Sequence, residues 1–141
     1  MIYIEKIGFD KPLKKSNIYP ENVLYPMGIE GLYLKEITIL YGSNGCGKST
    51  LLNLIAERIN CNNARAHINS YYDRESDTIE SPFVNVAKSL NVEWAKTEDG
   101  KKIEPNIPPY LIASNDVFSY INFASFSWKM GERLVSGSSN R

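Results

Sequence analysis

Residues 41–50 read Tyr41-Gly42-Ser43-Asn44-Gly45-Cys46-Gly47-Lys48-Ser49-Thr50. A glycine, four residues and then Gly-Lys-Ser is the pattern of a phosphate-binding loop when a strand precedes it and a helix follows. Glycines lack β-carbons, so backbone N–H groups can converge on phosphate oxygens. Lys48 supplies a mobile positive charge, and the Ser49 hydroxyl can ligate magnesium. The sequence therefore predicts that residues 42–50 bind the phosphates of a nucleotide.

The segments on either side of the loop meet both conditions. Residues 36–41 are short, apolar and β-branched, which is typical of a strand buried on both faces of a parallel sheet. After the loop, apolar residues recur at helical spacing at Leu51, Leu52, Ile55 and Ile59. We expect this helix to begin near Gly47, with the positive end of its dipole at the loop, and to end within residues 60–63.

Composition describes an ordinary globular chain. Of 141 residues, 43% are hydrophobic and 23% are charged, which fits one domain with a real core. Sixteen basic and sixteen acidic residues cancel, so net charge gives no indication of a nucleic-acid or anionic-membrane partner. The first residues lack the pattern of a signal peptide, and no apolar run is long enough for a membrane segment. A cytoplasmic protein is therefore expected.

Upstream of the loop, the pattern predicts one strand and a long connection. Residues 2–9 alternate apolar and polar, which indicates an edge or half-buried strand. Residues 10–30 contain three prolines and a glycine, which is typical of a loop, and residues 31–35 lead into the next strand. The order up to residue 60 is therefore strand, long loop, strand or hairpin, phosphate-binding loop and helix.

Downstream, several shorter elements are predicted. Residues 64–69, which include the only histidine, His67, are a short strand, and residues 81–90 are a helix capped by Ser81. Residues 92–96 and 101–104 flank an Asp-Gly turn and form a peripheral hairpin. Residues 110–113 are a core strand, and residues 114–116 cap a helix with an apolar stripe. No cysteine, histidine or carboxylate lies near His67 at a metal-ligand spacing, which favours a structural role.

The first 59 residues resemble the N-terminal lobe of ABC-type ATPases, particularly the SMC-like and overcoming-lysogenization-type branch, which belongs to the bacterial P-loop ATPases often grouped as AAA-family ATPases. The resemblance is carried by residues 37–52, where Asn44-Gly45 and Lys48-Ser49-Thr50-Leu51-Leu52 look typical of that class. It implies an α/β, P-loop NTPase-like fold with a mixed sheet. It also implies ATP bound with Mg²⁺, and a homodimer or a partner ATPase lobe that closes over the nucleotide.

The resemblance also points to three further candidate site residues. ABC proteins often stack an aromatic side chain on adenine upstream of the loop, where this chain has Tyr19, Tyr25 and Tyr33; distance along the chain favours Tyr25. Residues 112–120 resemble a strand-to-helix junction of related ATPases that reads Ser-Asp-Asp-Val-Phe. Here Asn115 replaces an aspartate before Asp116. These two residues either orient magnesium's water or sense the γ-phosphate, or they simply cap a helix.

Parts needed for hydrolysis are not recognisable. No run of four apolar residues after the loop ends directly in an acidic residue, and two residues separate residues 111–113 from Asp116. The sequence contains no glutamine, so the metal-bridging glutamine of ABC proteins is absent. Residues 134–138 resemble the ABC signature loop only faintly. We therefore expect residues 1–130 to form an incomplete ABC-type nucleotide-binding lobe, and residues 131–141 to form a flexible tail.

Three functions remain in competition. The first is an ABC/SMC-like ATPase lobe that binds ATP and hydrolyses it weakly, or only with segments supplied elsewhere. The second is a non-catalytic module in which nucleotide orders a surface for a partner. The third is a small P-loop kinase, which the scattered arginines at positions 65, 74, 133 and 141 disfavour, because kinases close an arginine-bearing lid over the phosphates.

Overall fold

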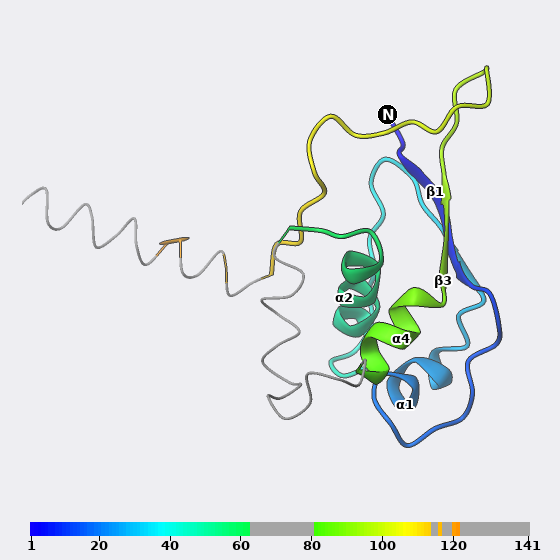
Figure 1. The fold of residues 1–141 in the computed structure, drawn as a ribbon. Coiled ribbons are helices and arrows are strands. Elements are labelled where there is room, and N and C mark those ends of the chain that lie inside the picture. Colours follow the sequence, from blue (N-terminus) through cyan, green and yellow to red (C-terminus); the bar gives the residue numbers. More distant parts are fainter. Residues whose placement is uncertain (63–80, 114–115, 117–119, 122–141) are drawn as a thin grey trace, which may run out of the picture. The chain divides into compact units, whose positions relative to one another are not determined.

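A three-stranded antiparallel sheet forms one layer of the computed structural model, which describes residues 1–62, 81–113, 116 and 120–121. Strand β1 (Ile4–Phe9) lies between β2 (Gly31–Tyr33) and β3 (Leu90–Trp94) (Figure 1). Ile7 pairs with Leu32 in β2 and with Val92 in β3. The predicted strand over residues 2–9 is confirmed as half-buried, but it is the central strand and not an edge strand.

Short helices cover one side of this sheet. They are α1 (Glu21–Leu24), the 3₁₀ turn η1 (Tyr25–Met27), α2 (Lys48–Arg58) and α4 (Pro82–Lys88), and all lie within the unit Met1–Leu111 (Figure 1). The buried core joins residues from the sheet and from α1, α2 and α4: Ile7, Leu24, Leu51, Leu54, Phe83, Ala87 and Leu90. The long connection over residues 10–30 therefore contributes packed helical turns that the prolines and glycine did not indicate.

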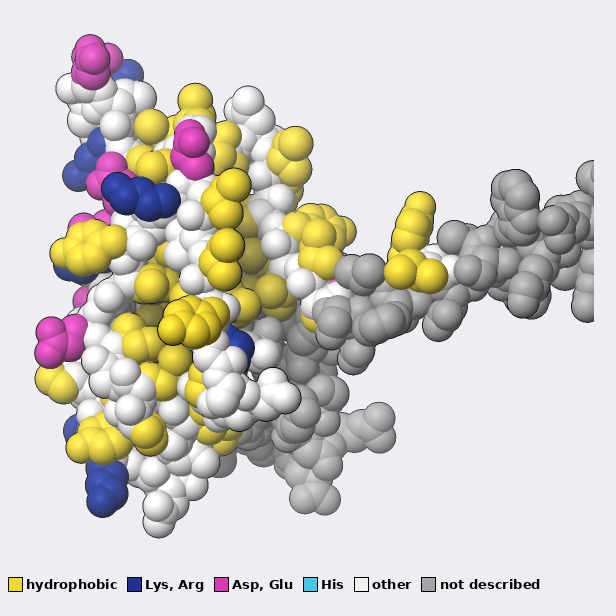
Figure 2. Space-filling view, turned by 180° about the vertical axis from the view of Figure 1, so that it is seen from behind, with side chains coloured by type: hydrophobic (Ala, Val, Ile, Leu, Met, Phe, Trp, Pro, Cys, Tyr) yellow, Lys and Arg dark blue, Asp and Glu magenta, His cyan; other side chains and the backbone are white. Residues whose placement is uncertain are grey.

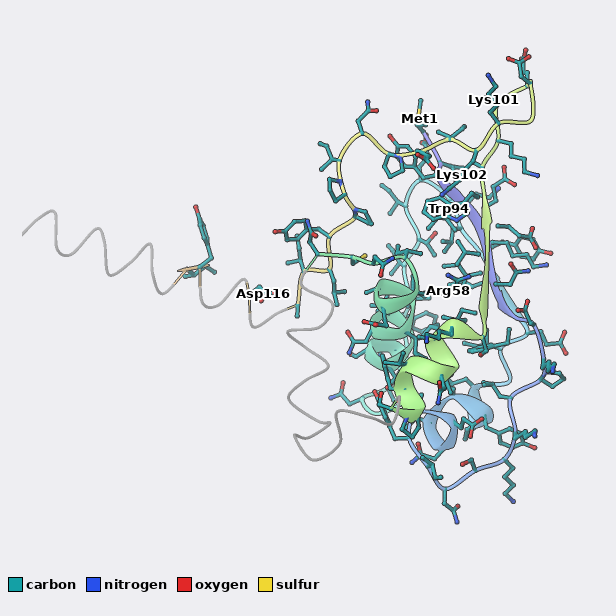
Figure 3. The ribbon with its side chains drawn as sticks, viewed as in Figure 1. Met1, Arg58, Trp94, Lys101, Lys102 and Asp116 are labelled. Atoms are coloured by element: carbon teal, nitrogen blue, oxygen red, sulfur yellow. The ribbon has the colours of Figure 1, made fainter. Side chains whose placement is uncertain are left out.

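Helix α2 confirms the predicted helix after the loop, with one error in its buried stripe. Leu51 is 2% exposed and Leu54 is fully buried, whereas Leu52 is 45% exposed. At the helix end, Asn60 has a φ of +53°. Arg58, in the last turn, donates a hydrogen bond from Nε to the Leu90 carbonyl oxygen at 2.7 Å (Figure 3). This bond ties the end of α2 to the beginning of β3.

The capped helix and the hairpin that follow it are confirmed, but the hairpin is not peripheral. The Ser81 hydroxyl accepts a hydrogen bond from the Val84 N–H at 3.3 Å, at the start of α4. The turn closes with Gly100 at a φ of +77°, and the Lys102 ammonium lies 3.8 Å from the centre of the Trp94 ring (Figure 3). Because β3 pairs with β1 along its whole length, the first arm of the hairpin is part of the main sheet.

Residues 36–41 do not form the predicted buried strand. No backbone–backbone hydrogen bond joins them to any other residue that the structure describes, and the last bond of the neighbouring ladder runs from the Leu34 N–H to the Glu5 carbonyl. Ile37 and Ile39 are each 82% exposed. The prediction was wrong because a parallel strand needs a neighbour, and the described sheet is entirely antiparallel.

The predicted core strand over residues 110–113 is also wrong within the described part of the chain. Tyr110 makes a single parallel bridge with Asn62, and Tyr110 and Ile112 are 59% and 69% exposed. In the unit Ile112–Arg141, Asp116, Tyr120 and Ile121 have helical backbone. The predicted strand at 64–69, His67, Asn115 and the tail over residues 131–141 lie outside the described residues.

Leu52 and Leu54 of α2 provide a matched test of this packing. Leu54→Ala should lower the free energy of unfolding by about 2–5 kcal/mol, because it opens a cavity in the core. Leu52→Ala removes the same atoms from a half-exposed site and should cost less than about 1 kcal/mol. Urea denaturation followed by circular dichroism measures both. Equal losses in the two variants would contradict the orientation of α2.

Candidate functional site

The junction between the loop and α2 depends on Gly47. This residue is the N-cap of α2 and has a φ of +96°, a backbone conformation that favours glycine. A β-carbon at this position would lie 2.7 Å from Met27 Sδ and 3.0 Å from Val23 Cγ1. The loop therefore packs against α1 and η1 through Gly47. Both its positive φ and its close neighbours favour a residue without a side chain. Lys48 and Ser49 follow as the first residues of the helix.

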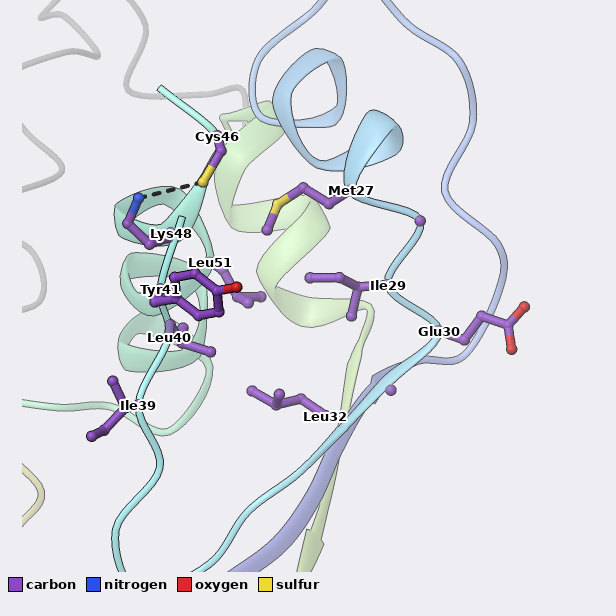
Figure 4. A pocket seen from close by; sticks show the side chains of 12 residues that line it. Met27, Ile29, Glu30, Leu32, Ile39, Leu40, Tyr41, Cys46, Lys48 and Leu51 are labelled. Carbon is purple, nitrogen blue, oxygen red and sulfur yellow. Dashed lines mark hydrogen bonds between the residues drawn. The ribbon is translucent and has the colours of Figure 1, made fainter. Parts of the chain in front are cut away.

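The Lys48 ammonium is held by the loop itself. Its Nζ donates hydrogen bonds to the carbonyl oxygens of Gly42 and Ser43, both at 2.7 Å, and lies 3.4 Å from Cys46 Sγ (Figure 4). No carboxylate pairs with Lys48 among the residues that the structure describes. The predicted site residues at 42–50 are thus brought together in one turn, with Ser43, Asn44 and Ser49 exposed to solvent.

Thr50 faces the protein instead of the solvent. It is 9% exposed, and its Oγ1 accepts a hydrogen bond from the Tyr19 hydroxyl at 3.3 Å. The Tyr19 ring stacks on Phe83 of α4, with ring centroids 6.0 Å apart and planes inclined by 11°. Thr50 therefore anchors the loop-bearing helix, and Tyr19 links this helix to α4.

An apolar cavity of about 490 Å³ opens beside the loop. Its walls come from residues 27–32 and 39–41, and Leu51, Cys46 and Lys48 line the end nearest the loop (Figure 4). Tyr41, 95% exposed, lies in this wall, and the Glu30 side chain points away from Lys48. The sequence did not indicate that Met27, Ile29 and Tyr41 line a cavity beside the loop. The only available signal was that Tyr41 directly precedes Gly42.

Tyr25 and Tyr33, the other two tyrosines considered as base contacts, lie in different surroundings. Tyr25 is 45% exposed and lines a separate cavity of about 330 Å³ together with Lys11 and Leu13. This cavity shares Gly28, Ile29 and Glu30 with the one beside the loop. Tyr33 is 71% exposed and lies under the Lys6 ammonium, 5.2 Å from its ring centre. Glu93 at 3.6 Å and then Tyr33 raise the pKa of Lys6 above its ordinary value.

The described residues offer few donors for a metal ion. They contain no group of three histidine, cysteine or acidic side chains that could hold one. In its own unit, Asp116 accepts a hydrogen bond at Oδ2 from the Ala113 N–H at 2.9 Å. Burial raises the pKa of the Cys61 thiol, which makes Cys61 a poor nucleophile at neutral pH.

Two glycine substitutions test the packing at the loop. Gly47→Ala should destabilise the protein by more than about 2 kcal/mol, because it combines positive-φ strain with a clash against Met27 and Val23. Gly45→Ala meets the same strain, at a φ of +79°, but its β-carbon would enter open space, so about 1–2 kcal/mol is expected. Urea denaturation of both variants measures the difference. Equal destabilisation would contradict the close approach of Gly47 to η1.

Comparisons with known proteins bear on the same part of the chain. The family model described as ABC transporter matches residues 31–107, which include the loop, α2 and the hairpin. Searches of curated proteins and of solved structures found no significant match. None of the helices in the described residues is long and apolar enough to cross a bilayer. Domains of the matched family are ATPases that generally bind ATP with Mg²⁺ and usually dimerise. Because the matched residues make up more than half of the chain, the chain belongs to the ABC transporter family.

Proposed function

We propose that this chain is a nucleotide-binding lobe of the SMC-like branch of ABC-type ATPases, and that it binds ATP with Mg²⁺ through residues 42–50. The observation that carries the proposal is the position of Lys48, whose ammonium is bonded to loop carbonyls at the N-terminus of α2. The family match over the same residues supports it.

Each loop residue has a role in this proposal. Backbone N–H groups of residues 43–48 would hold the phosphates, and Lys48, now bonded to the carbonyl oxygens of Gly42 and Ser43, would supply positive charge to phosphate oxygens. The exposed Ser49 hydroxyl is a magnesium ligand. Bound Mg²⁺ neutralises phosphate charge and fixes the phosphates in one orientation. Gly42, Gly45 and Gly47 allow the close approach of the backbone.

Hydrolysis should be weak in this chain alone. Phosphoryl transfer needs a group to position the attacking water and a carboxylate to support the metal. The described residues place no carboxylate beside Lys48. Asn115 and Asp116 remain candidates from sequence for orienting magnesium's water. The lack of a carboxylate beside Lys48 among the described residues supports a second candidate function, a non-catalytic module in which nucleotide orders a surface for a partner. It also makes a kinase the least favoured function.

Lys48→Ala tests the phosphate site directly. Loss of the charge-assisted bonds should weaken binding of a fluorescent ATP analogue with Mg²⁺ by at least about tenfold. Lys35→Ala removes an exposed lysine upstream of the loop and serves as the matched control with unchanged affinity. Absence of ATP binding by the folded wild type would refute the proposal. Phosphate release, measured in parallel, separates the two leading functions: rapid turnover that Lys48→Ala abolishes would exclude a non-catalytic module.

Tyr25 is the proposed base contact, and comparing ATP with inorganic triphosphate isolates its effect. Tyr25→Ala should weaken ATP binding by about fivefold or more through lost stacking, and should leave triphosphate binding unchanged. Tyr33→Ala, which alters an exposed ring on the sheet, is the control for both ligands. Competition against the fluorescent analogue gives the affinities. Equal weakening of ATP and triphosphate in Tyr25→Ala would show a structural effect and not a base contact.

A further inference from the structure

The hairpin that follows β3 places two lysines directly opposite one another. Lys96 pairs with Lys102, and backbone hydrogen bonds of 2.8 Å join the residues before and after this pair. This is the non-hydrogen-bonded arrangement, in which opposing side chains lie closest together. Like charges in such a pair repel one another and lower stability. Two ammonium groups held this close together form a site for an anion such as a carboxylate.

A cavity of about 570 Å³, which we call the hairpin cavity, lies beside the lysine pair. Its lining carries both signs of charge around an apolar centre: Glu5, Val92, Glu93, Trp94, Lys96 and Lys102. Figure 2, seen from the side opposite to Figure 1, shows acidic and basic side chains next to one another where the hairpin projects. Val92 and Trp94 are half-buried and supply the apolar surface (Figure 3). Apolar walls with a few convergent charged groups are typical of small-molecule sites.

Glu5 supplies the negative end of the hairpin cavity. The pairing of β1 with β3 shifts register between Ile4 and Lys6, so Glu5 is the extra residue of a β-bulge. Bulges re-aim side chains and are common beside functional sites. Glu93 is held by Lys6 at 3.6 Å. No ion pair among the described residues involves Glu5 or Lys96, so both charges are available to a ligand.

The spacing of the two charged ends indicates the size of the ligand. The bulge at Glu5 lies opposite the step from Glu93 to Trp94. Lys96 follows two residues after Trp94, so the backbone positions of the two ends are about 8 Å apart at the rise of a strand. The ends of an extended dipeptide or tripeptide are about 7–10 Å apart. The hairpin cavity therefore matches a zwitterion of that length with an apolar centre.

We propose that the hairpin cavity binds a short peptide with two free termini, a dipeptide or tripeptide with apolar side chains. Its carboxylate lies between the Lys96 and Lys102 ammonium groups, and its ammonium lies against Glu5. Its side chains cover Val92 and Trp94. Such a ligand relieves the repulsion between the two lysines and gives Glu5 a partner. The cavity contains no residue of the phosphate-binding loop, so this inference is independent of the proposed nucleotide function.

The tripeptide alanyl-leucyl-alanine tests the site, together with its N-acetylated and C-amidated forms. Titration into the isotope-labelled full chain should give a saturable shift of the Trp94 indole N–H resonance, which Trp94→Phe identifies. Blocking either terminus should weaken binding by about fivefold or more, because each block removes a charge-assisted hydrogen bond. The absence of a saturable shift would refute the proposal. Equally tight binding of the acetylated form would show that a carboxylate alone is recognised, and would also overturn it.

Two substitutions correspond to the two blocked termini. Lys96→Gln should weaken binding of the free tripeptide by about fivefold or more and leave the C-amidated form unchanged. Glu5→Gln should weaken the free tripeptide similarly and leave the N-acetylated form unchanged. Lys101→Gln and Glu98→Gln alter exposed residues of the same hairpin that do not line the cavity, and serve as matched controls. Equal weakening of free and blocked forms by either test variant would contradict the assigned contacts.

Lys48→Ala separates the hairpin cavity from the phosphate-binding loop. The loop also holds an ammonium group that attracts carboxylates, so the tripeptide needs a test of its location. Tripeptide affinity should be the same in Lys48→Ala and in the wild type, because Lys48 does not line the hairpin cavity. Weaker binding by Lys48→Ala would place the peptide at the loop and overturn the proposal. Tripeptide binding without ATP binding would refute only the proposed function.

Discussion

The close approach of Gly47 to Val23 and Met27 is the constraint on which the site depends. Because Gly47 has no side chain, α2 can begin directly against α1 and η1, and the loop is fixed to a packed part of the molecule. Two further contacts hold the same helix. Tyr19 bonds to Thr50 in its first turn, and Arg58 bonds to the Leu90 carbonyl in its last. The helix is thus fixed at both ends, and the loop residues that we propose bind phosphate take their position from it.

Sequence reasoning succeeded where the structure is decided locally. The glycine pattern predicted the loop, Ser81 predicted the start of α4, and Asp99-Gly100 predicted the turn of the hairpin. Each of these depends on the conformational preference of a few adjacent residues. Sequence reasoning failed where the structure of a segment depends on pairing with a distant segment. Residues 36–41 have the residue types typical of a strand, but a strand forms only when another strand pairs with it. The position of that other strand cannot be predicted from residues 36–41 alone.

The errors within correctly predicted elements have a similar origin. A helical stripe can include either Leu52 or Leu54, and which of them is buried depends on where α4 and the sheet lie. The three tyrosines considered as base contacts, Tyr19, Tyr25 and Tyr33, could not be separated by distance along the chain either. The fold places Tyr19 inside the packing of α2 and α4, and leaves Tyr25 and Tyr33 on the surface. Residue spacing identifies the kind of contact, whereas tertiary packing assigns the residue that makes it.

The bonds between Lys48 and the carbonyl oxygens of Gly42 and Ser43 have a consequence for ligand selection. The ammonium is already solvated by the protein, so an incoming anion must replace two short hydrogen bonds before it gains a salt bridge. A singly or doubly charged anion that contacts the loop at one point offers little in exchange. A polyphosphate chain would contact several backbone amides at once, and these contacts would compensate for the two hydrogen bonds that Lys48 gives up. If the loop binds nucleotide as proposed, the resting hydrogen bonds of Lys48 would favour a polyphosphate over an anion that contacts the loop at one point.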